Sequence, residues 1–326
     1  MQRVVLNGVG SDWADVISSV VQGSVLGPVL FIIYINDIDF AIKSCQTKIF
    51  KYADDSKIGR SIQAQTDAAA LQTDHDSVWA WSKKLGMDIH PLKTCVLHFG
   101  YYNKKYDYYL NGTQINKVTV AKDLGVLINN SCSPSDHIAE ITRKAKGVLS
   151  QLHRTIICRN KDVFINLFKI FVRPIIESAG PAWCPFEKQY IDQIEKIQRR
   201  ATRMVPGIGH MDYDERLNLC HLTTLEQRRQ RGDMIHVYKM LNVYTPTNND
   251  DFFCFANQRH DVSTRSSINN FLVAEKCHLD LRKYFFNNRI VQKWNSIPCE
   301  VREAESVNSF KIGYDEWIAC SVDITK

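Results

Sequence analysis

The stretch that decides the fold runs from residue 48 to residue 58 and reads KIFKYADDSKI. We expect a strand over residues 48–53, a turn at Asp54 and Asp55, and a returning strand from Ser56. Two adjacent carboxylates at the tip of a hairpin repel each other unless a cation lies beside them. Mg²⁺ prefers carboxylate and phosphate oxygens, so the pair suggests two-metal phosphoryl transfer. Aspartate is also a common turn former, and a purely structural turn is the alternative interpretation.

The segment before this hairpin predicts a loop followed by a helix. Residues 22–31 read QGSVLGPVLF and residues 33–38 read IYINDI. Pro28 suits the first turn of a helix, and the apolar run from Val29 to about Ile42 predicts that this helix is buried on all sides. Gly23 allows a close approach to the backbone, and Gln22 and Ser24 offer hydrogen bonds at the same place. The alternative is that Ser24 only caps the helix.

The rest of the chain divides into a mixed part and a helical part. Hydrophobic periodicity predicts a helix over residues 64–85, a strand over 95–99, a hairpin over 108–115 around Asn111-Gly112, and a strand over 124–128. Beyond residue 130 we expect helices over residues 137–152, 161–178, 188–204 and 224–241, with Gly207 ending the third. The fold class is therefore α+β, with domains at 1–130, 131–245 and 246–326.

Composition and charge narrow the class of protein. The chain has 326 residues, 44% of them hydrophobic, and a net charge of +6. No apolar stretch approaches the roughly 18 residues of a membrane span, so we expect a cytoplasmic or nuclear protein without a membrane partner. The ten cysteines form no C-x-x-C pair, which argues against a zinc ribbon or a disulfide framework.

The positive charge is concentrated in the helical part, where residues 137–241 hold 18 Lys and Arg against 11 Asp and Glu. Arg199, Arg200 and Arg203 fall on one helix face, and Arg228 and Arg229 begin a second basic cluster that continues to residue 231. Such faces suit a nucleic-acid backbone. The alternative is that these arginines pair with nearby acids, namely Glu195, Glu226 and Asp233.

Together these blocks closely resemble the reverse transcriptase of non-LTR (LINE-type) retrotransposons, particularly jockey-like elements. The resemblance implies a partial polymerase palm, with an antiparallel sheet and helices, followed by a helical thumb and a C-terminal region. It implies nucleotidyl transfer with Mg²⁺ at Asp54 and Asp55, on an RNA template, a DNA primer and dNTPs. Gln22, Gly23, Ser24 and Tyr52 would then bind nucleotide or template.

Two further blocks extend the resemblance. Residues 91–100 read PLKTCVLHFG, and Lys93 takes the place of a lysine proposed to protonate the departing pyrophosphate; a plain surface lysine is the alternative. Residues 123–128 read DLGVLI and resemble the strand that grips the primer end, with Leu124 and Gly125 at its close approach.

The chain also departs from the family pattern. A third metal-binding carboxylate is expected well upstream of Gln22, yet only 21 residues precede it. Residues 18–21 read SSVV where Ser-Gly-Val-Pro is usual. With one carboxylate block missing, we expect a polymerase fragment with activity near zero as an isolated chain. The competing hypotheses are a non-catalytic nucleic-acid-binding remnant that uses the basic helices, and a degenerate copy that does not fold stably.

Overall fold

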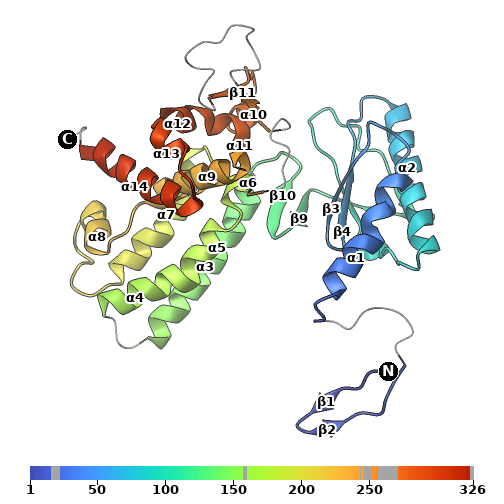
Figure 1. Cartoon of the computed structure of the whole chain (residues 1–326), viewed down its shortest axis with the longest axis horizontal. Coiled ribbons are helices and arrows are strands. Elements are labelled where there is room, and N and C mark those ends of the chain that lie inside the picture. Colours follow the sequence, from blue (N-terminus) through green and yellow to red (C-terminus); the bar gives the residue numbers. More distant parts are fainter. Residues whose placement is uncertain (16–22, 157–159, 243, 246–251, 256–270, 324–326) are drawn as a thin grey trace. The chain divides into compact units, whose positions relative to one another are not determined.

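The computed structural model describes residues 1–15, 23–156, 160–242, 244–245, 252–255 and 271–323. The chain forms two compact units, Met1–Thr119 and Val120–Lys326, each with its own hydrophobic clusters (Figure 1). The division comes before the boundary that we placed at 130, because the hairpin over residues 120–129 packs on the helical unit. In the described part of the chain, no helix has the length and apolarity to cross a membrane.

The first unit begins with a small hairpin of β1 (Val5–Leu6) and β2 (Val9–Gly10). Its turn is Asn7-Gly8, and both residues have positive φ, as this turn type requires. The predicted turn is thereby confirmed.

The next part of the unit packs two helices and a hairpin together. Its elements are α1 (Gly27–Ile35), the 3-10 helix η1 (Asn36–Ala41), β3 (Lys48–Tyr52), β4 (Asp55–Gly59) and α2 (Gln65–Lys84). Ile35, Ile38 and Val78 form the buried centre, and Ile49 and Ile58 pack on it from the hairpin. Asp67 accepts hydrogen bonds from the N–H groups of residues 63 and 64, which fixes the start of α2.

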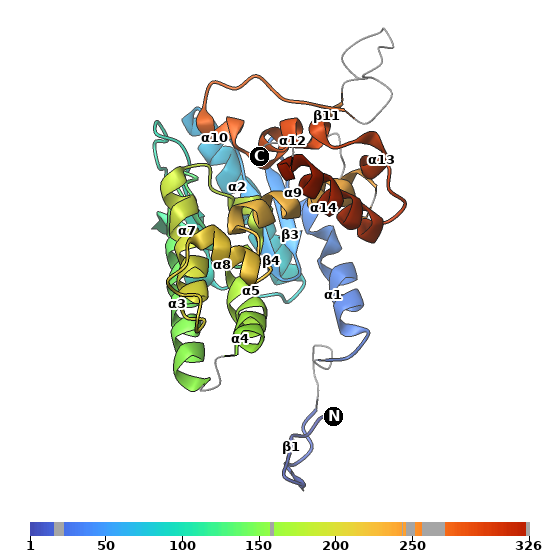
Figure 2. The same ribbon diagram turned by 90° about the vertical axis from the view of Figure 1, so that its left-hand side faces the viewer.

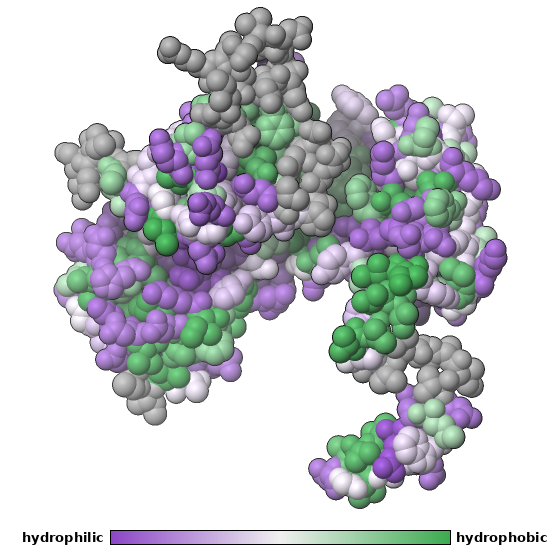
Figure 3. Space-filling view, in the orientation of Figure 1, coloured by the Kyte–Doolittle hydropathy of each residue, from purple (hydrophilic) through white to green (hydrophobic). Residues whose placement is uncertain are grey.

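The prediction that the helix from Val29 is buried on all sides is wrong. Val29, Leu30, Ile32 and Ile33 are 54%, 47%, 61% and 66% exposed, and only Ile35 of α1 is buried. The helix also ends at Ile35 and continues as η1 to Ala41. An apolar sequence predicts burial only where other elements cover it, and in this unit the outer face of α1 is open, as the apolar surface over α1 in Figure 3 shows.

The remainder of the first unit consists of short strands around a second small cluster. These are η2 (Pro91–Lys93), β5 (Cys95–Leu97), β6 (Tyr109–Leu110), β7 (Thr113–Gln114) and β8 (Asn116–Val118). The Asn111-Gly112 hairpin is confirmed. The expected antiparallel sheet is only partly present: the described strands form separate two-stranded pairs, and β5 runs parallel to β8.

The second unit is largely helical. After the hairpin of β9 (Val120–Asp123) and β10 (Val126–Asn129), it contains α3 (Ser135–Thr155), α4 (Lys161–Leu167), the π-helix η3 (Phe168–Val172), α5 (Arg173–Glu177), α6 (Gly180–Trp183), α7 (Lys188–Arg203), α8 (Tyr213–Leu219) and α9 (Leu225–Leu241) (Figure 2). The four predicted helices are confirmed, and Gly207 with φ of +82° follows the third. The short α8 was not predicted.

The C-terminal part folds onto α9. It contains β11 (Cys254–Phe255), β12 (Leu272–Val273), α10 (Asp280–Lys283), α11 (Phe286–Arg289), α12 (Val291–Ser296), α13 (Cys299–Arg302) and α14 (Val307–Asp323). Trp294, Phe310 and Tyr238 are almost fully buried in its core. Its helices α10 to α13 are only four to six residues long, which is too short to give a clear helical periodicity in the sequence.

Candidate functional site

The Asp54–Asp55 pair lies at the tip of the β3–β4 hairpin. Tyr52 pairs with Asp55 across the two strands, so the turn residues are Ala53 and Asp54, and Asp55 is the first residue of β4. The turn thus comes one residue earlier than predicted. Ala53 takes a positive φ of 49°, a conformation that L-residues other than Gly and Asn rarely adopt.

The two faces of this hairpin differ in character. Ile49 and Ile58 are paired and pack inward. Because side chains alternate along a strand, Tyr52 and Asp55 share the outward face with Phe50. Phe50 and Tyr52 are 59% and 64% exposed, so Asp55 is flanked by open aromatic surface.

The hairpin is tied to the preceding segment by Lys51. Its Nζ donates to the Asp39 carboxylate at 2.8 Å and to the Asn36 carbonyl at 3.2 Å, both in η1. Together with the packing of Ile49 and Ile58, this contact holds the base of the hairpin.

Both carboxylates at the tip are available to a ligand. Asp54 and Asp55 are exposed, and their carboxylates make no hydrogen bond or ion pair with any described residue. Their oxygens are the hard donors that Mg²⁺ prefers. Among the described residues, no group of three or more His, Cys, Asp or Glu side chains comes together as a metal site. The pair therefore fits part of a divalent-metal site, and the described residues do not complete it.

The predicted nucleotide-binding loop is only partly described. Gln22 lies outside the described residues. Gly23 has φ of +86°, a conformation suited to glycine, and the Ser24 hydroxyl accepts a hydrogen bond from the Gly27 N–H at 3.1 Å. Ser24 therefore stabilises the turn into α1, but it is not the N-cap that the alternative interpretation proposed, because that position is Leu26. Pro28 lies in the first helical turn as expected.

Lys93 ends η2, the short helix before β5. Its side chain is exposed, and it makes no hydrogen bond or ion pair with Asp54, Asp55 or any other described residue. Its ammonium group is thus available to a ligand, as it would equally be in a plain surface lysine.

Leu124 and Gly125 form the turn of the β9–β10 hairpin. The sequence had suggested that they lie inside a strand, which is wrong. Their φ values are 45° and 90°, and Leu124 is 51% exposed at the tip. The hairpin is anchored on α3: the Leu127 N–H donates to His137 Nδ1 at 3.2 Å, and the Asn129 amide donates to Asp136 at 2.6 Å. Burial lowers the pKa of His137, with a smaller effect of Lys144 in the same direction, which keeps the ring neutral and able to accept.

The basic face of α7 has the predicted arrangement. Ile194, Ile197 and Ala201 are buried, whereas Arg199, Arg200 and Arg203 are exposed. Glu195 is not their partner, because it is buried and accepts hydrogen bonds from the Tyr213 hydroxyl and the Leu225 N–H. The Arg199 guanidinium lies 4.1 Å from the centre of the Tyr213 ring, which orients it without neutralising its charge.

The second basic cluster lies differently. Arg228 pairs with Glu177 through two hydrogen bonds, and Arg231 pairs with Asp315 at 2.6 and 2.7 Å. Arg229 is only 6% exposed. The alternative of intramolecular pairing thus holds for Arg228, although with a partner that the sequence did not suggest. Neither Arg228 nor Arg229 lies on an open surface like that of α7.

One residue of the hairpin was missed by the sequence analysis. Phe50 lies two positions before Tyr52 and therefore on the same strand face as Tyr52 and Asp55. The alternation of side chains along a strand would have predicted this shared face from the sequence.

One part of the chain matches a protein-family model. Residues 8–128, which include both the loop at Gly23 and the hairpin at Asp54, match the family model described as reverse transcriptase (RNA-dependent DNA polymerase). No solved structure matches the chain.

The curated relatives are polymerases of mobile elements. The chain is 24% identical over 217 residues to the RNA-directed DNA polymerase from mobile element jockey of Drosophila melanogaster, which covers 63% of this chain and 24% of the relative. It is also 24% identical over 200 residues to the probable RNA-directed DNA polymerase from transposon X-element of the same species, covering 59% and 22%. The matched part thus spans about a quarter of the length of these relatives. The predicted resemblance to reverse transcriptases of jockey-like non-LTR elements is confirmed.

Proposed function

We propose that residues 1–119 hold part of the nucleotidyl-transfer centre of an RNA-directed DNA polymerase. The observation that carries this proposal is the pair of exposed, unpartnered carboxylates, Asp54 and Asp55, at the tip of a hairpin whose base is anchored. The hairpin lies inside the segment that matches the reverse transcriptase family model.

In this proposal Asp54 and Asp55 hold divalent metal, with Mg²⁺ as the natural ion. Bound metal would stabilise the charge that develops on the attacking and leaving oxygens. The rings of Phe50 and Tyr52, exposed beside Asp55, offer a flat surface for the sugar or base of the incoming nucleotide. Lys93 would supply a proton to the departing pyrophosphate, and Gly23 and Ser24 would border the template strand, together with Gln22.

The second unit would hold the template and primer. Leu124 and Gly125 form a protruding turn on an anchored hairpin, which suits contact with the primer end. Arg199, Arg200 and Arg203 offer unneutralised charge for RNA or DNA phosphates, without reading the base sequence. The terms palm for residues 1–130, thumb for 131–245 and C-terminal region for 246–326 belong to this proposal.

We further propose that the 326-residue chain binds metal weakly and extends no primer by itself. Two-metal transfer needs carboxylates that act as a unit, and the described residues bring no third acidic side chain to Asp54 and Asp55. This proposal therefore predicts a chain that binds divalent metal but does not extend a primer.

The test combines Mn²⁺ binding, measured by electron paramagnetic resonance, with primer extension on an RNA template. Replacing Asp54 and Asp55 by Asn should weaken Mn²⁺ binding by about tenfold or more, equivalent to about 1.4 kcal/mol, while Asp88→Asn, an exposed aspartate elsewhere in the unit, should leave it unchanged. Equal binding in all three proteins would remove the proposed metal site. Primer extension that Asp54→Ala abolishes would instead refute the proposed inactivity and support the site.

A further inference from the structure

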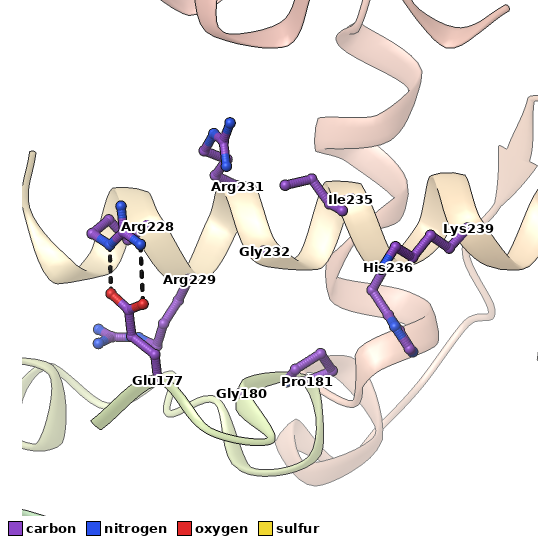
Figure 4. Close-up of a pocket in the computed structure, with 10 residues that line it drawn as sticks. All are labelled: Glu177, Gly180, Pro181, Arg228, Arg229, Arg231, Gly232, Ile235, His236 and Lys239. Carbon is purple, nitrogen blue, oxygen red and sulfur yellow. Dashed lines mark hydrogen bonds and ion pairs between the residues drawn. The ribbon is translucent and has the colours of Figure 1, made fainter. Parts of the chain in front are cut away.

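A cavity of about 280 Å³ lies between α9 and the segment that joins α5 to α6 (Figure 4). Its charged lining is almost entirely basic and contains a single acidic side chain, Glu177. The basic side chains are Arg228, Arg229, Arg231, His236 and Lys239. The cavity lies wholly within the second unit.

Arg229 is the unusual member of this lining. It is only 6% exposed, and neither of its terminal guanidinium nitrogens has a hydrogen-bond partner among the described residues. The nearby Asp233 carboxylate is already engaged by Arg289, with two hydrogen bonds of 3.1 Å. The Cys184 thiol interacts with the Arg229 side chain, but burial raises the pKa of this thiol, and a neutral thiol is a weak partner for a guanidinium. Burying a guanidinium whose terminal nitrogens make no hydrogen bond is costly, which points to a ligand of opposite charge.

Two of the other basic side chains form ion pairs within the protein, and a third is free to bind a ligand. Arg228 is held by Glu177, and Arg231 by Asp315, so both form fixed walls. Lys239 makes no hydrogen bond or ion pair through its ammonium group within the part of the chain that the structure describes. At one cavity, Arg229 and Lys239 therefore provide two positively charged groups whose terminal nitrogens have no hydrogen-bond partner among the described residues.

Two glycines keep this cavity open from opposite sides. Gly232 lies in the middle of α9 and Gly180 begins α6, and a Cβ added at either would meet no atom within 4 Å. Packing therefore does not require glycine at these positions. A glycine inside a helix costs about 1 kcal/mol relative to alanine. Glycine at position 232 thus lowers the stability of the helix but leaves open space beside it. This is expected where a ligand enters.

We propose that this cavity binds a single phosphate-type oxyanion, which is inorganic phosphate or the terminal phosphate of a nucleic acid. The planar guanidinium of Arg229 would donate two parallel hydrogen bonds to the oxyanion. Lys239 lies ten residues further along α9, toward the other end of the cavity in Figure 4, and would add positive charge without touching the same oxyanion. The site goes beyond the polymerase proposal, because it uses no residue of the Asp54–Asp55 hairpin. It also differs from a surface that binds along the backbone of a nucleic-acid duplex. Arg229 is buried, so only a small group such as a single phosphate can reach it.

The test is titration calorimetry of the full chain with inorganic phosphate at constant ionic strength, accompanied by the thermal shift that phosphate produces. Arg229→Met should weaken phosphate binding by about tenfold or more. It should not lower the melting temperature measured without phosphate, because it removes a buried unpaired charge. Gly232→Gln serves as a second variant, since it fills the cavity from an exposed helix position without disturbing any packed neighbour.

Arg143→Met is the matched control, because it removes one arginine charge from the exposed surface of α3. Unchanged phosphate binding by both Arg229→Met and Gly232→Gln would overturn the proposal, as would absence of binding to the unmodified chain. Equal weakening by Arg143→Met would also overturn it, since only net charge would then matter. A 5′-phosphorylated oligonucleotide that binds more tightly than its 5′-hydroxyl counterpart assigns the site to nucleic-acid ends; equal binding of the two, with inorganic phosphate bound, assigns it to the free ion.

Discussion

At the scale of single residues, the hairpin tip shows how far chemistry can be located from sequence. Asp54 and Asp55 were placed at a turn, and the structure exposes both there. The turn itself is Ala53-Asp54, because its position depends on the Tyr52–Asp55 pairing and on a positive φ at Ala53. Nothing in the local sequence favours that conformation for alanine, so the register could not be predicted.

Arg229 shows the opposite case, since its burial could not be predicted from its neighbours. In sequence it is one of several arginines in a basic helix. Its environment depends on segments that are far away in the chain. Cys184 lies beside it, and Arg289 forms a separate ion pair with the Asp233 carboxylate. The interactions of a charged residue with distant segments are invisible to helical periodicity.

His137 makes a prediction about pH. Burial lowers its pKa from an ordinary value of about 6.5, and its Nδ1 must stay unprotonated to accept the Leu127 N–H. The unfolded chain therefore binds more protons below that pH, and stability is fully present above about 6.5 and is lost as the pH falls. For one histidine, the slope is at most about 1.4 kcal/mol per pH unit.

Urea unfolding between pH 8 and pH 5 measures this effect. His137→Gln keeps an acceptor for the Leu127 N–H but does not titrate, so the loss of stability with falling pH should become smaller. Some loss should remain, because burial also lowers the pKa values of His75 and His236. His210→Gln removes an exposed histidine as a control; if it flattens the profile as much as His137→Gln does, the explanation through burial is wrong.

At the scale of elements, sequence patterns predicted local structure better than exposure. Asn7-Gly8 and Asn111-Gly112 predicted their hairpins, because these residues accept the positive φ that two-residue turns require. The long helices were also predicted from their spacing. The exposure of α1 was predicted wrongly, because hydrophobicity describes the residue and burial depends on what covers it.

The basic face of α7 should contribute to nucleic-acid affinity through phosphate contacts. Replacing Arg199, Arg200 and Arg203 by Gln is expected to reduce the slope of log K against log salt for duplex binding by up to about 2.7, at about 0.9 per phosphate contact. The measurement is fluorescence anisotropy with an RNA–DNA hybrid over a range of salt concentrations.

The control for this face is a set of equally exposed residues on α3, namely Arg143, Lys144 and Lys146, replaced by Gln. Their loss should change the slope much less. An equal change would mean that the α7 face has no special role. Circular dichroism of the α7 variant shows whether the fold survives the loss of the Arg199 contact with Tyr213.

At the scale of the whole molecule, the chain consists of two units with separate cores. The described hydrophobic clusters each lie entirely in residues 1–119 or in residues 120–326. Sequence periodicity placed the change of character at 130. It could not show that the hairpin over residues 120–129 belongs to the second unit, because that depends on contacts with α3.

A fragment of residues 120–326 should therefore fold without the first unit. We expect a cooperative thermal transition by circular dichroism and a dispersed NMR spectrum. A fragment of residues 131–326 is the matched comparison, and it should be less stable by about 1–3 kcal/mol, because it loses the packing of Val126 and the hydrogen bond to buried His137. If the two fragments are equally stable, the hairpin does not belong to this unit.

The open face of α1 has a practical consequence for handling the protein. Leu30, Ile32 and Ile33 form an apolar surface that is open to water, next to further exposed residues such as Val25 and Leu26. Surfaces of this kind make molecules adhere to one another, to chaperones and to plastic. One short helix will therefore add to the tendency of the chain to associate, and mild detergent or a solubilising fusion partner is the natural choice for its purification.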